Sequence, residues 1–131
     1  MIQRNGADLP ALHERESEVM EQIWDAAGET TVRAVMEVLN RRDGHDRAYT
    51  TFMTIMSRLA DKGFLARRRE GKTDVYWPTT SRAEYLEWRA AREVEALVDL
   101  YGDAAFVHFA RQMNTLDPRH REQLRRLARR G

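Results

Sequence analysis

The hydrophobic period of the sequence changes at Gly63, and this change restricts the fold more than any other feature. Before Gly63, apolar residues recur at i, i+3, i+4 and i+7, the spacing of one buried helix face. Two short extended runs follow Gly63 around a turn at Gly71 and Lys72, which predicts a β-hairpin over residues 64–77. In the helix predicted over residues 49–62, the buried face consists of Phe52, Ile55, Met56 and Leu59.

Two more helices are predicted before this one. Apolar residues at helical spacing indicate a first helix over residues 12–26, and Gly28 offers a stop. Thr30 or Thr31 can cap a second helix, which the Gly-containing loop "RRDGHDR" ends. The order helix, helix, helix, hairpin is typical of a winged helix-turn-helix.

A capping box at Ser81 and Glu84 predicts the start of another helix, and we place a domain boundary there. Further helices are expected after Gly102 and from Pro118. The predicted fold class is mainly α with a small β-hairpin wing. It divides into a flexible leader (1–11), a winged helix-turn-helix domain (12–80) and a C-terminal helical region (81–131).

The composition excludes several classes of protein. The chain has 131 residues, a formal net charge of +1 and no cysteine, which rules out disulfides and thiol catalysis. No apolar run approaches the roughly 20 residues that span a bilayer, and the first ten residues lack the apolar core of a signal peptide. We therefore expect a cytoplasmic protein without a membrane partner.

The charges are separated along the chain. Residues 8–29 contain seven Asp and Glu against Arg15 alone, and we interpret this acidic group as solvated surface. Residues 58–72 contain six Lys and Arg against two acidic residues. A polyanion would therefore meet one local basic patch.

The helix over residues 49–62 directs small polar side chains away from its apolar face. Thr50, Met53, Thr54 and Ser57 should point outward, where hydroxyl and methyl groups can contact base edges in the major groove. Arginines of the hairpin can neutralise phosphates. These features predict double-stranded DNA as the partner. The predicted DNA-binding residues are Arg33, Tyr49, Thr50, Thr51, Met53, Thr54, Ser57, Arg58, Arg67, Arg68, Arg69 and Lys72.

An enzymatic function is not expected. "GKT" at residues 71–73 lacks the earlier glycine of a phosphate-binding loop, because position 66 is Ala66. No nucleophile–base pair is apparent, and the four histidines lack the spacing of metal ligands on one helix. We therefore predict no catalytic residue, no metal and no cofactor.

Three segments resemble the penicillinase-repressor family (BlaI/MecI-like, with the related CopY repressors). They are "ESEVMEQIWDAAGETTVRAVMEVLN", "AYTTFMTIMSRLADKGFL" and the wing ending "YWP". The resemblance implies a bacterial homodimeric repressor on a palindromic operator, with residues 49–62 as recognition helix. Some relatives are released by a regulatory protease that cuts an Asn-Phe bond; the counterpart here is His108-Phe109, without the asparagine.

Residues 81–131 are too few to bury their apolar stripes alone, so those stripes need a partner surface. We favour a second copy, with docking on the winged domain as the alternative. A winged-helix protein-interaction module that does not bind DNA specifically is the alternative function. The predicted dimer-interface residues are Leu86, Ala90, Val94, Leu97, Tyr101, Phe106, Val107, Phe109, Leu124 and Leu127.

Overall fold

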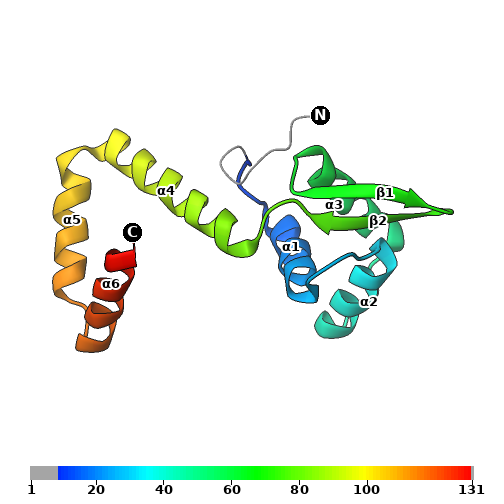
Figure 1. Cartoon of the computed structure of the whole chain (residues 1–131), viewed down its shortest axis with the longest axis horizontal. Coiled ribbons are helices and arrows are strands. Elements are labelled where there is room, and N and C mark those ends of the chain that lie inside the picture. The colour runs from blue at the N-terminus through cyan, green and yellow to red at the C-terminus, as the bar shows by residue number, and fades with distance from the viewer. Residues whose placement is uncertain (1–8, 131) are drawn as a thin grey trace. The chain divides into compact units, whose positions relative to one another are not determined.

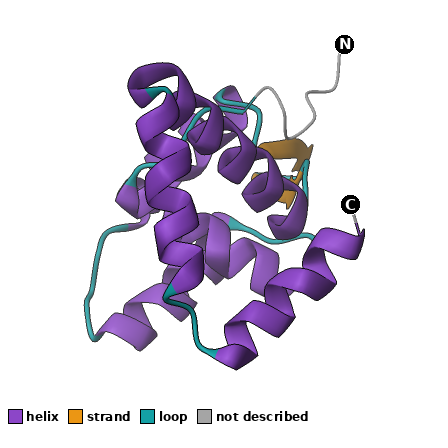
Figure 2. Cartoon of the chain, turned by 90° about the vertical axis from the view of Figure 1, so that its left-hand side faces the viewer, coloured by secondary structure: helices purple, strands orange, loops and turns teal. Residues whose placement is uncertain are grey.

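The structure is a computed structural model that describes residues 9–130. Helices make up all of its regular structure except one β-hairpin, which confirms the predicted fold class (Figure 2). In chain order the elements are α1 (Glu14–Ala26), α2 (Val32–Asp43), α3 (Tyr49–Asp61), β1 (Leu65–Glu70), β2 (Thr73–Pro78), α4 (Arg82–Tyr101), α5 (Asp103–Asn114) and α6 (Pro118–Arg130) (Figure 1).

The contacts divide the chain into two compact units, Met1–Arg89 and Ala90–Gly131. The first holds α1, α2, α3, the hairpin and the start of α4. Most of the predicted leader, residues 1–8, lies outside the described residues, but Leu9 is fully buried in the core of the first unit. The division at residue 80 into a DNA-binding and a dimerisation domain stays a prediction.

The core of the first unit collects the apolar faces of three helices and the hairpin. The predicted buried face of α3 is in place, with Phe52, Met56 and Leu59 at most 2% exposed and Ile55 9% exposed. Burying each such side chain stabilises the fold by about 1.5–3 kcal/mol. Its partners come from α1, α2 and the hairpin: Val19, Met20, Ile23, Val32, Val35, Leu39, Phe64, Leu65 and Tyr76.

The hairpin is fixed to the helices at its base. β1 and β2 pair antiparallel around Gly71, whose φ of 63° suits the tight turn. Thr30, in the loop between α1 and α2, forms an isolated bridge with Tyr76 through two 2.8 Å backbone hydrogen bonds. The wing is therefore held against the α1–α2 loop as well as against α3.

The first turns of α4 belong to the core of the first unit. Ser81 Oγ accepts a hydrogen bond from Glu84 N at 3.1 Å, so the helix starts where the capping box predicts. Tyr85 is 7% exposed, packs edge-on against Phe64, and accepts a hydrogen bond from Leu12 N at 3.2 Å. For this reason the first compact unit continues to Arg89.

None of the helices described in the structure combines the length and the apolar character that a membrane-spanning helix needs.

A buried ion pair joins the start of α1 to the end of α3. Glu16, 5% exposed, accepts hydrogen bonds from Lys62 Nζ at 2.7 and 2.9 Å and from His13 N at 3.0 Å. Burial alone would raise the pKa of Glu16, but the Lys62 ammonium and the His13 amide lower that pKa below its ordinary value. The carboxylate therefore stays charged in the folded protein at neutral pH.

Glu16→Gln should lower the free energy of unfolding at pH 7 by about 1–3 kcal/mol, because the ion pair between Glu16 and Lys62 is lost. A folded-state pKa below the unfolded value of about 4.3 stabilises the protein above that value, and this stabilisation disappears as pH falls through the folded pKa. Urea denaturation at pH 7 and pH 3.5 measures both effects. The matched control is Glu14→Gln, on the exposed side of the same turn. Equal losses for the two variants, or a difference that does not shrink in acid, would contradict the assigned role of the pair.

Candidate nucleic-acid interface

The outward face of α3 carries the side chains that the sequence predicts there. Thr50, Thr51 and Thr54 are exposed, as is Arg58, while Ser57 is half-buried. Met53 is 42% and Tyr49 40% exposed. Hydroxyl groups both donate and accept hydrogen bonds, and the short threonine side chain leaves room for close approach to a base edge. This face suits the floor of a DNA major groove.

The beginning of α3 is open to an anion. Ala48 occupies the N-cap position and supplies no side-chain hydrogen bond, so the first amides of α3 keep their partial positive charge uncapped. The Arg33 guanidinium, from the first turn of α2, lies 5.8 Å from the centre of the Tyr49 ring. Arg33 and the α3 N-terminus thus place positive charge at one end of the exposed face.

The turn that precedes α3 is held by Asn40, a residue that the sequence reasoning missed. Asn40 Nδ2 donates to Arg47 O at 3.0 Å, and Arg47 N donates back to Asn40 Oδ1 at 3.1 Å. Gly44 ends α2 with a φ of 67°. A polar residue at the end of a helix before a short loop is the signal that indicates such a clasp. The clasp fixes the direction in which α3 leaves α2.

Arg67 connects the wing to the exposed face of α3. Its Nη1 lies 3.5 Å from both Ser57 Oγ and Tyr76 Oη, so it touches hydroxyl groups and no carboxylate. The hydrogen bond to Tyr76 raises the pKa of Arg67 further above its ordinary value. Arg67 therefore brings a positive charge to the edge of α3, and the nearby carboxylates of Asp74 and Asp61 raise its pKa as well.

Arg68 is held differently. Its guanidinium donates to both carboxylate oxygens of Glu29 and, at 2.9 Å, to Glu70, and it lies 5.5 Å from the centre of the Trp77 ring. The hydrogen bonds to Glu29, and to a smaller extent the hydrogen bond to Glu70, raise the pKa of Arg68. Two carboxylates surround one cation, so a phosphate would have to compete with both. The structure gives Arg68 a fastening role between the wing and the α1–α2 loop.

The remaining cations of the wing and of the exposed face of α3 divide in the same way. Arg69 pairs with Asp74 across the hairpin at 3.4 Å and also donates to Gly71 O. Within residues 9–130, Lys72 and Arg58 make no ion pair or side-chain hydrogen bond. Arg58, Arg67 and Lys72 are therefore the basic side chains best placed to neutralise phosphates.

The interpretation of the acidic group as solvated surface is wrong for Glu16, which is 5% exposed, whereas three other members form ion pairs at the surface. Glu16 binds Lys62, Glu29 binds Arg68, and both Glu21 and Asp25 bind Arg82. Arg82 also lies 5.8 Å from the centre of the Trp24 ring, which ties α4 to α1. These pairs join residues far apart in sequence, and only the alternation of acidic and basic segments could have suggested them.

The site offers binding and no catalytic chemistry. Within residues 9–130, no three His, Cys, Asp or Glu side chains form a group that could hold a metal ion. The geometry consists of one helix face of small polar groups, an open helix N-terminus and cations at its margins. Such a surface fits a polyanion with groove edges to contact.

Comparison with known proteins points to one family. The sequence model described as "Penicillinase repressor" matches residues 12–130. A protein named transcriptional regulator BlaI from Mycobacterium tuberculosis (strain ATCC 25618 / H37Rv) is 35% identical over 111 residues, which cover 82% of this chain and 77% of the relative. A protein named penicillinase repressor from Bacillus licheniformis is 29% identical over 79 residues, 60% of this chain and 59% of the relative.

A solved structure is similar to part of the chain. The solution structure of the DNA-binding domain of the repressor BlaI aligns with a TM-score of 0.50 and 28% identity. The alignment covers 59% of this chain and 90% of that domain.

Arg58→Gln should lower the steepness of the salt dependence of duplex binding by about 0.9, the value of one lost phosphate contact. Arg68→Gln should change that slope by less than half as much, because its charge is already compensated by Glu29 and Glu70. Fluorescence anisotropy between roughly 50 and 200 mM salt measures both slopes. A larger change for Arg68→Gln than for Arg58→Gln would make Arg68 a phosphate contact.

Proposed function

The chain belongs to the penicillinase repressor family, and we propose that it is a sequence-specific DNA-binding repressor that inserts α3 into the major groove of its operator. The single observation that carries this assignment is the row of exposed Thr50 and Thr54 and half-buried Ser57 on a helix whose opposite side is packed in the core. A helix fits the major groove, and hydroxyl groups can contact base edges there. The hairpin then contacts the sugar-phosphate backbone through Arg67 and Lys72.

The relatives support the assignment by their names and by their extent. They are named a transcriptional regulator and a repressor, and the aligned solution structure is of a DNA-binding domain. The alignment with that domain covers 90% of its length. A winged-helix module that binds another protein is the alternative, and its binding would not weaken steeply with salt.

We propose further that two copies associate through the second unit. None of the described residues of this unit is buried, and nine of its large apolar side chains are 40–71% exposed. About 40 residues are too few to build a self-sufficient core. Exposed apolar surface of this extent is typical of a protein–protein interface. All ten predicted interface residues are exposed, from Leu86 to Leu127.

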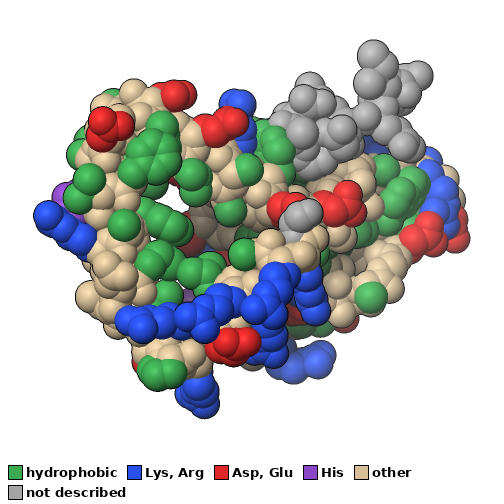
Figure 3. Space-filling view, turned by 60° about the vertical axis from the view of Figure 1, so that its left-hand side comes forward, with side chains coloured by type: hydrophobic (Ala, Val, Ile, Leu, Met, Phe, Trp, Pro, Cys, Tyr) green, Lys and Arg blue, Asp and Glu red, His purple; other side chains and the backbone are tan. Residues whose placement is uncertain are grey.

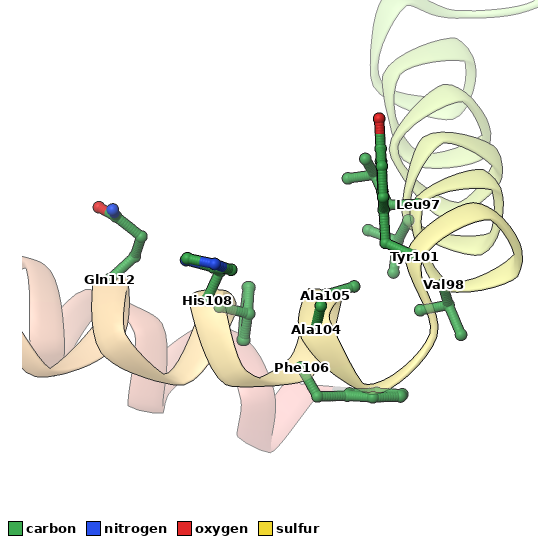
Figure 4. A pocket seen from close by; sticks show the side chains of 10 residues that line it. Leu97, Val98, Tyr101, Ala104, Ala105, Phe106, His108 and Gln112 are labelled. Carbon is green, nitrogen blue, oxygen red and sulfur yellow. The ribbon is translucent and has the colours of Figure 1, made fainter.

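The corner between α4 and α5 shows how such an association would proceed. A cavity of about 720 Å³ lies there, bordered by Leu97 and Tyr101 of α4 and by His108 and Gln112 of α5 (Figure 4). An apolar cavity open to water is unfavourable, and apolar side chains of a second copy would fill it. A two-fold dimer would present two α3 helices to two half-sites about 34–36 Å apart, which corresponds to a palindromic operator.

A release mechanism by proteolysis at His108–Phe109 would need a further step. Both residues lie inside α5, which runs from Asp103 to Asn114. A protease binds its substrate in an extended form, so α5 would have to unfold locally before this bond could be cut. A regulatory protease therefore remains a proposal that depends on the stability of α5.

Thr54→Ala should change the sequence preference of the protein while leaving its affinity for random duplex within about threefold, because the hydroxyl contacts bases rather than phosphates. Selection of bound sites from a pool of random duplexes, followed by sequencing, measures the preference. The matched control is Thr115→Ala, at the C-terminal end of α5. Unchanged selected sequences for Thr54→Ala would remove this residue from base recognition.

Leu97→Asp should convert dimers into monomers, since it places a charge at the wall of the α4–α5 cavity, where Leu97 is 50% exposed. Light scattering at micromolar concentration gives the mass directly. Ala83→Asp adds the same carboxylate to the exposed first turn of α4 and should leave the dimer intact. A dimer that survives Leu97→Asp would place the interface elsewhere.

A further inference from the structure

The last helix carries a second concentration of positive charge that α3 and the wing do not explain. Of the thirteen residues of α6, six are arginine, none is lysine, and Glu122 is the single acidic residue. All of its residues are exposed. The space-filling view shows a band of Lys and Arg side chains on the face turned toward the viewer (Figure 3). The arginines of α6 are Arg119, Arg121, Arg125, Arg126, Arg129 and Arg130.

The arginines occupy one side of α6. At about 100° per residue, they fall within one half of the helix circumference. Leu124, Leu127 and Ala128 fall on the other half, where Leu124 is 40% and Leu127 53% exposed. The helix is therefore divided into a narrow apolar side and a broad side that carries the six arginines together with Glu122, which we call the arginine face.

Most of this charge has no internal partner. Arg121 donates to Asn114 O at 2.8 Å, and Arg125 lies 3.8 Å from Glu122. The side chains of the other four arginines make no ion pair or hydrogen bond with any residue in the range 9–130. The wing differs, because Arg68 and Arg69 both bind carboxylates.

Several arginines of this face repel one another. Arg121 and Arg125, Arg125 and Arg129, and Arg126 and Arg130 are like charges four residues apart, and each such pair destabilises a helix. An anion that binds across these pairs would relieve the repulsion. Because guanidinium groups match the geometry of phosphate oxygens in pairs, a phosphate polymer is the ligand that fits best.

An anionic membrane fits the helix less well. Helices that lie in a membrane interface bury a wide apolar face, usually with Trp or Phe, whereas the apolar side of α6 offers two leucines and an alanine. We propose that the arginine face is a second, sequence-independent binding surface for the nucleic-acid backbone, separate from α3 and the wing. It adds affinity for any duplex and leaves the choice of sequence to α3.

The test compares the full chain with the variant R119Q/R126Q/R129Q/R130Q on a random-sequence duplex, by fluorescence anisotropy at several salt concentrations. The slope of log affinity against log salt should become shallower by about 2–4, since two to four phosphate contacts are lost. The matched control R119K/R126K/R129K/R130K keeps the charges and should keep most of the slope. Circular dichroism and light scattering confirm that helix content and mass are unchanged.

Three outcomes would overturn the proposal. The first is an unchanged slope in the glutamine variant. The second is a loss of dimer mass without a change of slope, which would assign the arginines to acidic side chains of a second copy. The third comes from a parallel measurement of binding to phosphatidylserine vesicles: the glutamine variant keeps its duplex binding but loses its vesicle binding. The proposed function can fail separately. If the wild-type chain binds all duplex sequences equally, while the glutamine variant still has a shallower salt slope, the proposed sequence-specific function is contradicted and this proposal stands.

Discussion

The burial of one apolar side of α3 is the constraint on which the rest of the structure depends. Phe52, Met56 and Leu59 are at most 2% exposed among side chains from α1, α2 and the hairpin. Turning the helix to hide its threonines would expose this stripe and lose several kcal/mol, at about 1.5–3 kcal/mol per side chain. The hydroxyl face points to solvent because the opposite face is needed by the core, and the proposed DNA-binding surface is therefore a consequence of folding.

Charged side chains perform two separate tasks in the first unit. One set joins elements: Lys62 with Glu16, Arg68 with Glu29, and Arg82 with Glu21 and Asp25. The other set, which includes Arg58 and Lys72, has no acidic partner within residues 9–130. This division explains why a nearly neutral chain, with a formal net charge of +1, can still present local positive charge to a polyanion.

The periodicity of the sequence was sufficient to predict the helices and the hairpin, because each of these elements is determined by residues that are close together in the sequence. The stripe from Phe52 to Leu59 and the turn at Gly71 are local signals of this kind. The first helix ends at Ala26 as predicted, although Ala27 and not Gly28 occupies the C-cap position, in the left-handed conformation with a φ of 52°. Local signals also identified the exposed face of α3, since the outward side follows from the buried one.

Interactions between distant residues could not be predicted in this way. Glu16 and Lys62 are separated by 46 positions, and Arg68 and Glu29 by 39, so nothing in either segment alone identifies its partner. The same limit applies to Tyr85, which belongs to the core of the first unit although it follows the predicted boundary at Ser81. These contacts decide which arginines remain available for phosphate, and they appear only when the chain is folded.

The orientation of α3 toward DNA is tested most directly by site-specific cross-linking, which the absence of native cysteine makes simple. A photo-activated cross-linker is attached to a single cysteine at Thr54 or, for comparison, at Glu14 on the exposed side of α1. The account predicts that the probe at position 54 cross-links to duplex DNA and that the probe at position 14 does not. Cross-linking from position 14 with none from position 54 would contradict it.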